Sequence, residues 1–268
     1  MPLDRIWLCG DVHGDLRALH RALAQAVEPP LAVLLVGDLD PPQPVGDWLA
    51  SIGDAGVETW FIHGNHETDS DLVFSNMFES PGHERNLHGR VQTIAGLRVA
   101  GLGGVFRSEV WYPPAEPSFE DYAALEMYWW YRTPRHQRSK RGTEDTATVI
   151  AGKRMRKHRT SIFPGPYATL ASQRADVLIV HEAPSCHPHG FQAIDDLARG
   201  MGARWVAHGH HHDALDYRAY TQSLGFTAIG VGLRGITTLS GKQIVAGELD
   251  ARRSRTRMPT GEGRDDVT

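Results

Sequence analysis

Short apolar runs that end in oxygen- and nitrogen-donor side chains are the feature that most constrains this chain. A strand buried on both faces reads as a continuous apolar run, and in open α/β sheets functional side chains gather beyond the carboxyl ends of the strands. Donors that follow such runs at several strand ends predict a metal site, here for two ions. The donor clusters are Gly10-Asp11-Val12-His13-Gly14, Gly37-Asp38, His63-Gly64-Asn65-His66-Glu67, His181 and His208-Gly209-His210-His211-His212.

Alternating apolar periods predict a sheet covered by helices. Apolar residues at helical spacing from Leu16 to Val27 indicate a first helix, and Pro29-Pro30 ends it. Further helices are expected at about 45–54, from 166 and near 191–200. The expected strands follow, with Ala95-Gly96 as a hairpin turn between two of them: 6–9, 31–36, 58–62, 91–94, 97–102, 177–180, 205–207, 217–220, 226–231 and 243–248.

The alternation breaks at an insertion of about 106–165, which has no steady apolar period. Loops of this length are usually functional or disordered. Its aromatic run 128–131 either stacks on a nucleobase or packs the insertion against the main sheet. Its basic stretch 132–159, with ten Lys or Arg residues, either binds phosphate or forms a solvated face. We expect a single domain over 1–250 and a mobile polar tail over 251–268.

Charge, cysteine content and apolar run length indicate the compartment of the protein and the partners it can bind. The formal net charge of −4 supplies no overall attraction for nucleic acid, although a local basic patch in the insertion could still act. Only two cysteines, Cys9 and Cys186, are present, which fits a reducing compartment. The N-terminus lacks the layout of a signal peptide, and no apolar run approaches about 18 residues. These features predict a cytoplasmic protein without membrane contact.

In the order and content of its donor motifs, the sequence resembles the calcineurin-like metallophosphoesterase superfamily. The family pattern is Asp-x-His, Gly-Asp, Gly-Asn-His, a lone His and Gly-His-x-His, and it matches at Asp11/His13, Gly37/Asp38, Gly64/Asn65/His66, His181 and Gly209/His210/His212. The likeness covers roughly 1–104 and 166–250. The motifs at 10–14 and 64–67 look closest to PPP-type phosphatases and bacterial diadenosine tetraphosphatases. The resemblance implies an αββα sandwich of two mixed sheets, with the insertion as a cap.

The resemblance also implies a ligand set for two ions. Asp11, His13 and His212 would hold the first ion, and Asp38 would bridge to the second. Asn65, His181 and His210 would complete the second site. Imidazole, carboxylate and amide donors without a thiolate suit Mn, Fe, Zn, Co or Ni.

The reaction implied is hydrolysis of phosphomonoester or phosphoanhydride bonds by direct attack of a metal-bridging hydroxide. His66 would protonate the leaving oxygen. In PPP enzymes an Asp three residues after the bridging Asp orients this histidine, and an Arg after it binds the substrate. Here Pro41 and Pro42 stand at those positions. Asp40 is therefore the candidate partner of His66, and Arg107 is the candidate for binding substrate phosphate.

The sequence is compatible with several classes of substrate. Candidates are a phosphorylated small molecule, a nucleotide or a phosphoprotein. One alternative is a phosphodiesterase or nuclease that binds nucleotides or nucleic acid through the basic insertion. A second alternative is a scaffold that binds metal without turnover, although a scaffold has no need for a proton donor at His66.

Overall fold

A computed structural model of the chain describes residues 3–53, 56–132 and 155–250. It contains two five-stranded sheets. In the first, named sheet A, the strand order is β10-β9-β1-β2-β3, with β1 Ile6–Cys9, β2 Ala32–Val36, β3 Glu58–Ile62, β9 Ile236–Thr238 and β10 Gln243–Val245. In the second, named sheet B, the order is β4-β5-β6-β7-β8, with β4 Arg90–Ile94, β5 Leu97–Leu102, β6 Val177–Val180, β7 Trp205–His208 and β8 Thr227–Gly230.

Both sheets are mixed. In sheet A, β1, β2 and β3 run parallel, while β9 is antiparallel to β1 and to β10. In sheet B, β5 to β8 run parallel, and β4 forms an antiparallel hairpin with β5. The parallel strands of each sheet therefore present their carboxyl ends at one edge, where the donor clusters begin.

The two sheets pack face to face and share a core. Neighbouring side chains of a strand point to opposite faces, so Ile6 and Leu8 of β1 lie in the core between the sheets, with Ile179 of β6. Trp7 and Cys9 of β1 point to the other face and pack in the outer core of sheet A. This alternation makes each central strand apolar throughout, as the sequence predicted.

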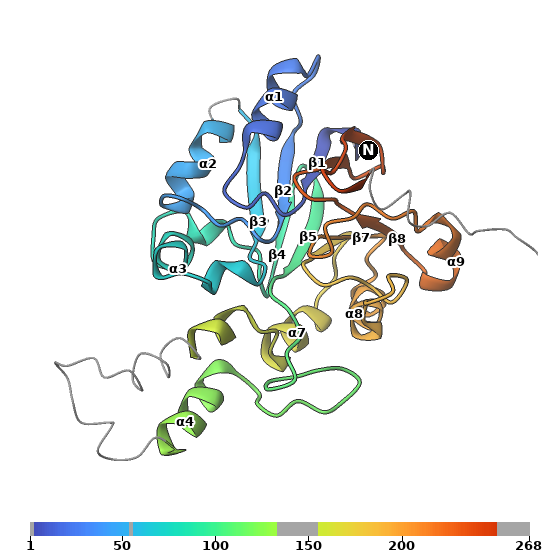
Figure 1. Cartoon of the computed structure of the whole chain (residues 1–268). Coiled ribbons are helices and arrows are strands. Elements are labelled where there is room, and N and C mark those ends of the chain that lie inside the picture. The colour runs from blue at the N-terminus through green and yellow to red at the C-terminus, as the bar shows by residue number, and fades with distance from the viewer. Residues whose placement is uncertain (1–2, 54–55, 133–154, 251–268) are drawn as a thin grey trace, which may run out of the picture.

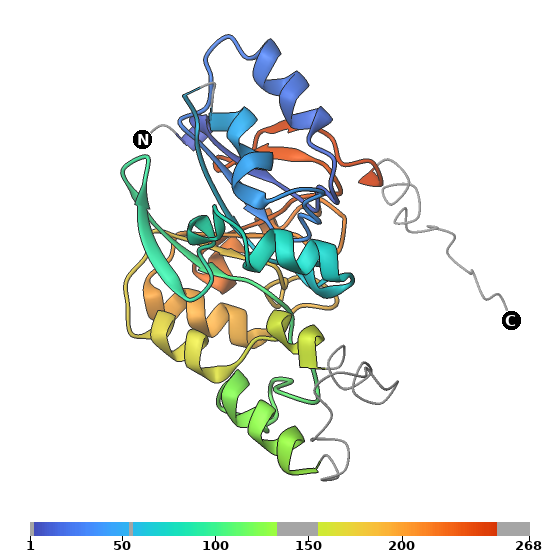
Figure 2. The same ribbon diagram turned by 90° about the vertical axis from the view of Figure 1, so that its left-hand side faces the viewer.

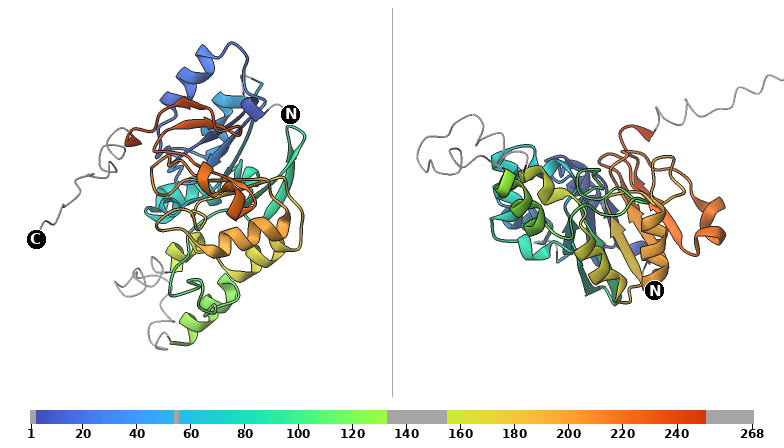
Figure 3. Two further views of the ribbon diagram at one scale, coloured as in Figure 1. Left: turned by 90° about the vertical axis from the view of Figure 1, so that its right-hand side faces the viewer. Right: turned by 90° about the horizontal axis from the view of Figure 1, so that it is seen from below.

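Helices cover the outer face of each sheet (Figure 1). On sheet A these are α1 Arg17–Gln25, α2 Val45–Gly53 and α3 Asp71–Phe78, and on sheet B they are α7 Pro164–Ala171 and α8 Gln192–Met201. Figure 2 shows the two groups of helices on opposite sides of the strands, and Figure 3 shows β9 and β10 beside the N-terminal half of the chain. The predicted αββα sandwich of two mixed sheets is confirmed.

One predicted strand is wrong, and two observed elements were not predicted. The expected strand at 217–220 is a 3₁₀ turn, Arg218–Tyr220, followed by the short helix α9 Thr221–Leu224. The carboxylate of Asp216 accepts the backbone N–H of Arg218 at 3.0 Å, a local bond that favours a turn over a strand. The helix α3 and the strand β9 were not predicted.

The insertion is partly helical. Its described parts contain α4, Tyr122–Arg132, and two limbs, 105–111 and 155–162, that lie side by side, since the N–H of Ile162 donates to the carbonyl of Val105 at 3.0 Å. Figure 2 shows α4 beyond α7, away from the sheets. Trp129 packs in the small cluster around Leu125, but Trp130 and Tyr131 are 56% and 69% exposed. Packing of the whole aromatic run against the main sheet is therefore wrong.

Two predictions fall mainly on residues that the structure does not describe. Most of the basic stretch lies within 133–154, and the predicted tail is 251–268. The basic cap and the mobile tail therefore stay predictions. Within the described ranges, no helix is both long and apolar enough to cross a membrane.

Candidate metal centre

The seven predicted ligands meet at one edge of the sandwich, which we call the rim. They are Asp11, His13, Asp38, Asn65, His181, His210 and His212. They follow the carboxyl ends of β1, β2 and β3 in sheet A and of β6 and β7 in sheet B. Nitrogen and oxygen atoms of His13, Asp38 and His212 lie within 4.8 Å of one another, and so do those of Asp38, His181 and His210. Asp38 belongs to both groups. This arrangement is the one that a carboxylate shared by two ions requires.

The other two predicted ligands lie in the same place. Asn65 Oδ1 is 3.3 Å from His181 Nε2. Asp11 Oδ1 accepts the backbone N–H of His210 at 2.9 Å, while its Oδ2 is buried and, among the described residues, has no hydrogen-bond partner. A buried carboxylate oxygen without a donor is costly, and a cation at this position would satisfy it. The residues present therefore fit a metal.

The backbone at the rim is strained. Five of the seven residues have a left-handed conformation without being glycine, with φ of 37° at Asp11, 42° at His13, 50° at Asp38, 67° at His210 and 56° at His212. Such residues typically cost on the order of 1–3 kcal/mol each and cluster at functional sites. Loop hydrogen bonds hold them, among them the one from the N–H of His13 to the carbonyl of Asp38 at 3.0 Å.

Two glycines allow the loops to approach this closely. A Cβ on Gly37 would collide with the ring of His181, and one on Gly64 would collide with the carboxylate of Asp38. Gly37 also has a φ of 104°, which favours glycine. The glycines of the donor motifs are thus required by the crowding around Asp38 and His181.

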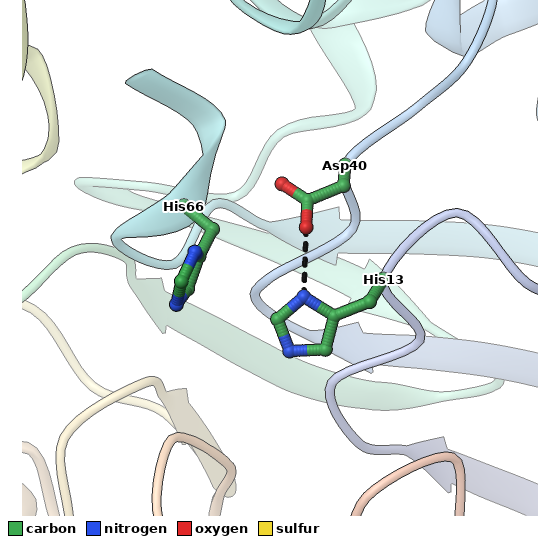
Figure 4. A group of neighbouring side chains, drawn as sticks. All are labelled: His13, Asp40 and His66. Atoms are coloured by element: carbon green, nitrogen blue, oxygen red, sulfur yellow. Dashed lines mark hydrogen bonds and ion pairs between the residues drawn. The ribbon is translucent and has the colours of Figure 1, made fainter. Parts of the chain in front are cut away.

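Hydrogen bonds fix the orientation of two of the imidazoles. His181 Nδ1 lies 2.8 Å from the carbonyl of Val36. Because a carbonyl only accepts, this nitrogen carries a proton, and Nε2 faces Asp38 Oδ2 at 3.3 Å. His13 Nδ1 likewise donates to Asp40 Oδ2 at 2.7 Å (Figure 4). Both imidazoles therefore present Nε2 to the rim, as metal-ligating histidines with a carboxylate or carbonyl partner do.

Asp40 was expected beside His66, but its hydrogen bond goes to His13. His66 Nδ1 instead donates to Asp69 Oδ2 at 2.6 Å, and its Nε2 is 4.0 Å from Asp38 Oδ2. The side chain of His66 is 42% exposed, so it lies at the open side of the rim. The sequence reading missed Asp69. The available signal was its spacing, since residues three apart eclipse in a 3₁₀ turn such as His66–Thr68.

Glu67 is part of the motif at 64–67, but the sequence assigned it no role. Its buried carboxyl group accepts the N–H of Leu39 at 2.6 Å and the N–H of Gly64 at 2.9 Å. It therefore ties the loop after β2 to the loop after β3. Burial, together with the neighbouring charge of Asp38, raises the pKa of Glu67 to about 8.

The charges at the rim call for a cation. Burial raises the pKa of Asp11 to about 7, with His181 acting in the opposite direction. Burial disfavours the charged form of His181, but the carboxylates of Asp38 and Asp11 outweigh this and raise its pKa to about 10. The carboxylates thus draw a proton onto a fully buried imidazole, and positive charge from a metal ion would replace that proton.

Arg107 lies at the base of the insertion. Its Nη1 donates to the carbonyl of Thr160 at 2.7 Å and to Ser161 Oγ at 3.2 Å. Burial lowers its pKa, and the carboxylates of Glu109, Glu182, Asp69 and Asp38 oppose that shift. The guanidinium is thus within electrostatic reach of the rim, where Asp38 and Asp69 lie.

The chain is similar to several known proteins. The chain is 36% identical over 246 residues to a Haemophilus influenzae protein (strain ATCC 51907 / DSM 11121 / KW20 / Rd) described only as uncharacterized, a match that covers 90% of this chain and 96% of the relative. Among solved structures, it is similar to TT1561 of Thermus thermophilus, with a TM-score of 0.48, 14% identity, and coverage of 88% and 95% of the two chains. It is also similar to the phosphopantetheinyl hydrolase PptH from Mycobacterium tuberculosis, with a TM-score of 0.42, 14% identity, and coverage of 95% and 93%.

The family comparison covers most of the chain. The pattern described as calcineurin-like phosphoesterase matches residues 4–214, which include all seven rim residues. Two five-stranded sheets and the paired groups around Asp38 accompany that match. The chain therefore belongs to the calcineurin-like phosphoesterase family.

Proposed function

We propose that the protein is a binuclear metal-dependent phosphoesterase that hydrolyses phosphomonoester or phosphoanhydride bonds. The observation that carries this proposal is the position of Asp38 in two ligand groups at once, one with His13 and His212 and the other with His181 and His210. A site for one ion would need only one pair of imidazoles beside Asp38, whereas the structure places a pair on each side of it.

Each residue of the rim has a part in the proposed reaction. Asp11, His13 and His212 would hold the first ion, Asn65, His181 and His210 would hold the second, and Asp38 would contribute to both sites. When bound, Mn, Fe, Zn, Co or Ni ions supply Lewis acidity, which activates water and offsets negative charge on the phosphoryl oxygens.

The remaining residues act on the substrate or support the ligands. His66, half exposed at the rim, donates a proton to the leaving oxygen. Arg107 attracts the phosphate. Asp40 would act through His13, because their 2.7 Å hydrogen bond leaves Nε2 of His13 free to hold the first ion. The motifs at 10–14 and 64–67 favour a phosphatase-like reaction over a nuclease, because they resemble those of PPP-type phosphatases and diadenosine tetraphosphatases.

The test is hydrolysis of p-nitrophenyl phosphate by the metal-free protein after addition of Mn²⁺, followed by a chelator. We expect turnover that appears with the metal and disappears with the chelator. Asp38→Ala should lose turnover and bind fewer than two ions per chain, whereas Asp47→Ala, an exposed carboxylate on α2, should change neither. Two ions per chain in Asp38→Ala would contradict the shared carboxylate.

A substrate panel separates the alternatives. It should contain phosphomonoesters, phosphopeptides, dinucleoside polyphosphates, cyclic nucleotides and single-stranded RNA and DNA. Preference for the cyclic nucleotides or the polymers would establish the phosphodiesterase alternative. No chelator-sensitive turnover on any of them, with two ions bound, would establish the scaffold.

A further inference from the structure

We propose that Asp69 is the positioning residue of His66, in place of the carboxylate that follows the bridging Asp in PPP enzymes. The proposal rests on the proposed function, because it assigns a role within the same site. Asp69 comes from the turn that follows β3, and Asp38 from the loop that follows β2.

The contact itself is short and directional. His66 Nδ1 and Asp69 Oδ2 are 2.6 Å apart, and a short N–H to carboxylate contact is typical of a charge-assisted hydrogen bond. Because a carboxylate only accepts, the proton of this bond is on Nδ1. The other ring nitrogen, Nε2, then faces the rim, 4.0 Å from Asp38 Oδ2. Asp69 therefore determines which nitrogen meets the substrate.

The competing carboxylate is already engaged. Asp40 lies close enough to His66 to form a group with it and His13, but its hydrogen bond goes to His13, as the dashed line in Figure 4 shows. The rings of His13 and His66 meet edge to face, with centroids 5.1 Å apart. Each of the two imidazoles thus has a carboxylate of its own, with Asp40 serving the ligand and Asp69 the proton donor.

The local backbone holds Asp69 in place without help from the substrate. The N–H of Asp69 donates to the carbonyl of His66 at 2.9 Å and closes the 3₁₀ turn. Residues three apart eclipse in this turn, so the two side chains lie one above the other. Thr68, inside the turn, is hydrogen-bonded to Thr160 at 3.3 Å between their Oγ1 atoms.

Asp69 stays ionised while His66 transfers a proton from Nε2 to the leaving oxygen. In the protonated ring both nitrogens carry hydrogen. The Nε2–H bond breaks as the bond from that hydrogen to the leaving oxygen forms, and a neutral imidazole remains with its hydrogen on Nδ1. That product tautomer is the one in which Nδ1 donates to a carboxylate. Asp69 therefore selects this tautomer over the one with hydrogen on Nε2 and keeps the ring's orientation through the step.

A kinetic cycle tests the role. We expect Asp69→Ala to lower kcat for phenyl phosphate, a poor leaving group, about tenfold, and to lower it much less for p-nitrophenyl phosphate. In a His66→Ala background the same change should have no further effect, because Asp69 acts through His66. Equal losses on both substrates, or additive losses in the double variant, would overturn the proposal. Glu79→Ala removes an exposed carboxylate at the end of α3 and serves as the matched control.

A spectroscopic readout tests the pair independently of turnover. Long-range ¹H–¹⁵N spectra at alkaline pH report which ring nitrogen carries the hydrogen. We expect hydrogen on Nδ1 of His66 in the wild type and a shift toward Nε2 in Asp69→Ala, with Glu79→Ala unchanged. An unchanged His66 tautomer in Asp69→Ala would overturn the proposal. Absence of turnover in the wild type would instead overturn the proposed function, with the tautomer still deciding whether Asp69 orients His66.

Discussion

Three histidines at the rim are oriented by acceptors that lie outside the metal motifs. His181 uses the carbonyl of Val36, His13 uses Asp40 and His66 uses Asp69. An imidazole can present either nitrogen, so the acceptor decides which one is available for a metal or a substrate. The chemistry of each histidine is therefore set by a residue at the opposite side of its ring.

Glu67 provides a test of how much one buried side chain holds the rim together. Glu67→Ala leaves the N–H groups of Leu39 and Gly64 without their acceptor. Each buried group that loses its partner costs about 1–3 kcal/mol, so we expect the free energy of unfolding to fall by about 3 kcal/mol. Urea unfolding of the metal-free protein measures it. A fall below about 0.5 kcal/mol, the usual range for a surface substitution, would show that water replaces the carboxyl group.

The sequence was sufficient to place the candidate ligands at the sheet edge, and insufficient for the residues that hold them there. Asp38 and His181 follow apolar strands directly, so their positions at the sheet edge can be read from the chain. Asp69 and Glu67 depend on how a 3₁₀ turn and two distant loops are arranged. No period in the sequence encodes that arrangement, and Asp40 was accordingly paired with the wrong histidine.

At the scale of elements, the return limb of the insertion is attached to the turn that carries His66. Thr160 is hydrogen-bonded to Thr68 of this turn, and Arg156 forms an ion pair with Asp71 at the start of α3. Lys157 pairs with Glu109 of the insertion's first limb at 2.7 Å. The insertion is thus connected by specific contacts to the turn that carries His66 and to the helix that follows it. A change in the insertion can reach the rim through this connection.

Thr160→Val tests the connection with little change in shape. Thr160 is fully buried, and its hydroxyl contacts Thr68 Oγ1 at 3.3 Å and the carbonyl of Lys157 at 2.9 Å. We expect faster hydrogen exchange at the amide of Asp69, which closes the turn, and a loss of about 1–2 kcal/mol in stability. Thr169→Val, on the exposed side of α7, should leave both unchanged. Unaltered exchange at Asp69 would mean that the turn is stable without the contact between Thr160 and Thr68.

The helices and strands that were predicted correctly have a local apolar pattern, and those that were missed lack such a pattern or depend on distant contacts. β2 and β6 are continuous apolar runs buried on both faces, and they were predicted within a residue of their observed bounds. The helix α3 buries only Asn76 and Met77, so it has no apolar stripe to detect. β9 has three residues and is completed by pairing with β1, a partner far away in the sequence.

At the scale of the molecule, the candidate ligands come from both halves of the sandwich. Asp11, Asp38 and Asn65 follow strands of sheet A, and His181 and His210 follow strands of sheet B. The unfolded chain has no comparable arrangement. Ions bound at the rim therefore stabilise the folded state and link the two sheets.

Thermal unfolding with and without metal measures this link. At a free metal concentration of about 100 times the dissociation constant, binding adds about 2.7 kcal/mol of stability. For a domain of this size we expect Tm to rise by about 5–10 °C and to return when a chelator is added. Asp38→Ala should show little of the rise. An unchanged Tm of the wild type at saturating metal would contradict binding at the rim.

The position of β1 has a consequence for synthesis. β1 lies between β2 and β9 in sheet A, so one of its two edges is covered only after Ile236–Thr238 has been made. At a synthesis rate of about 5–20 residues per second, the nascent chain carries that open apolar edge for roughly 10–45 s. Exposed strand edges are sites of aggregation, so we expect the yield of folded protein in a cell to depend on translation speed.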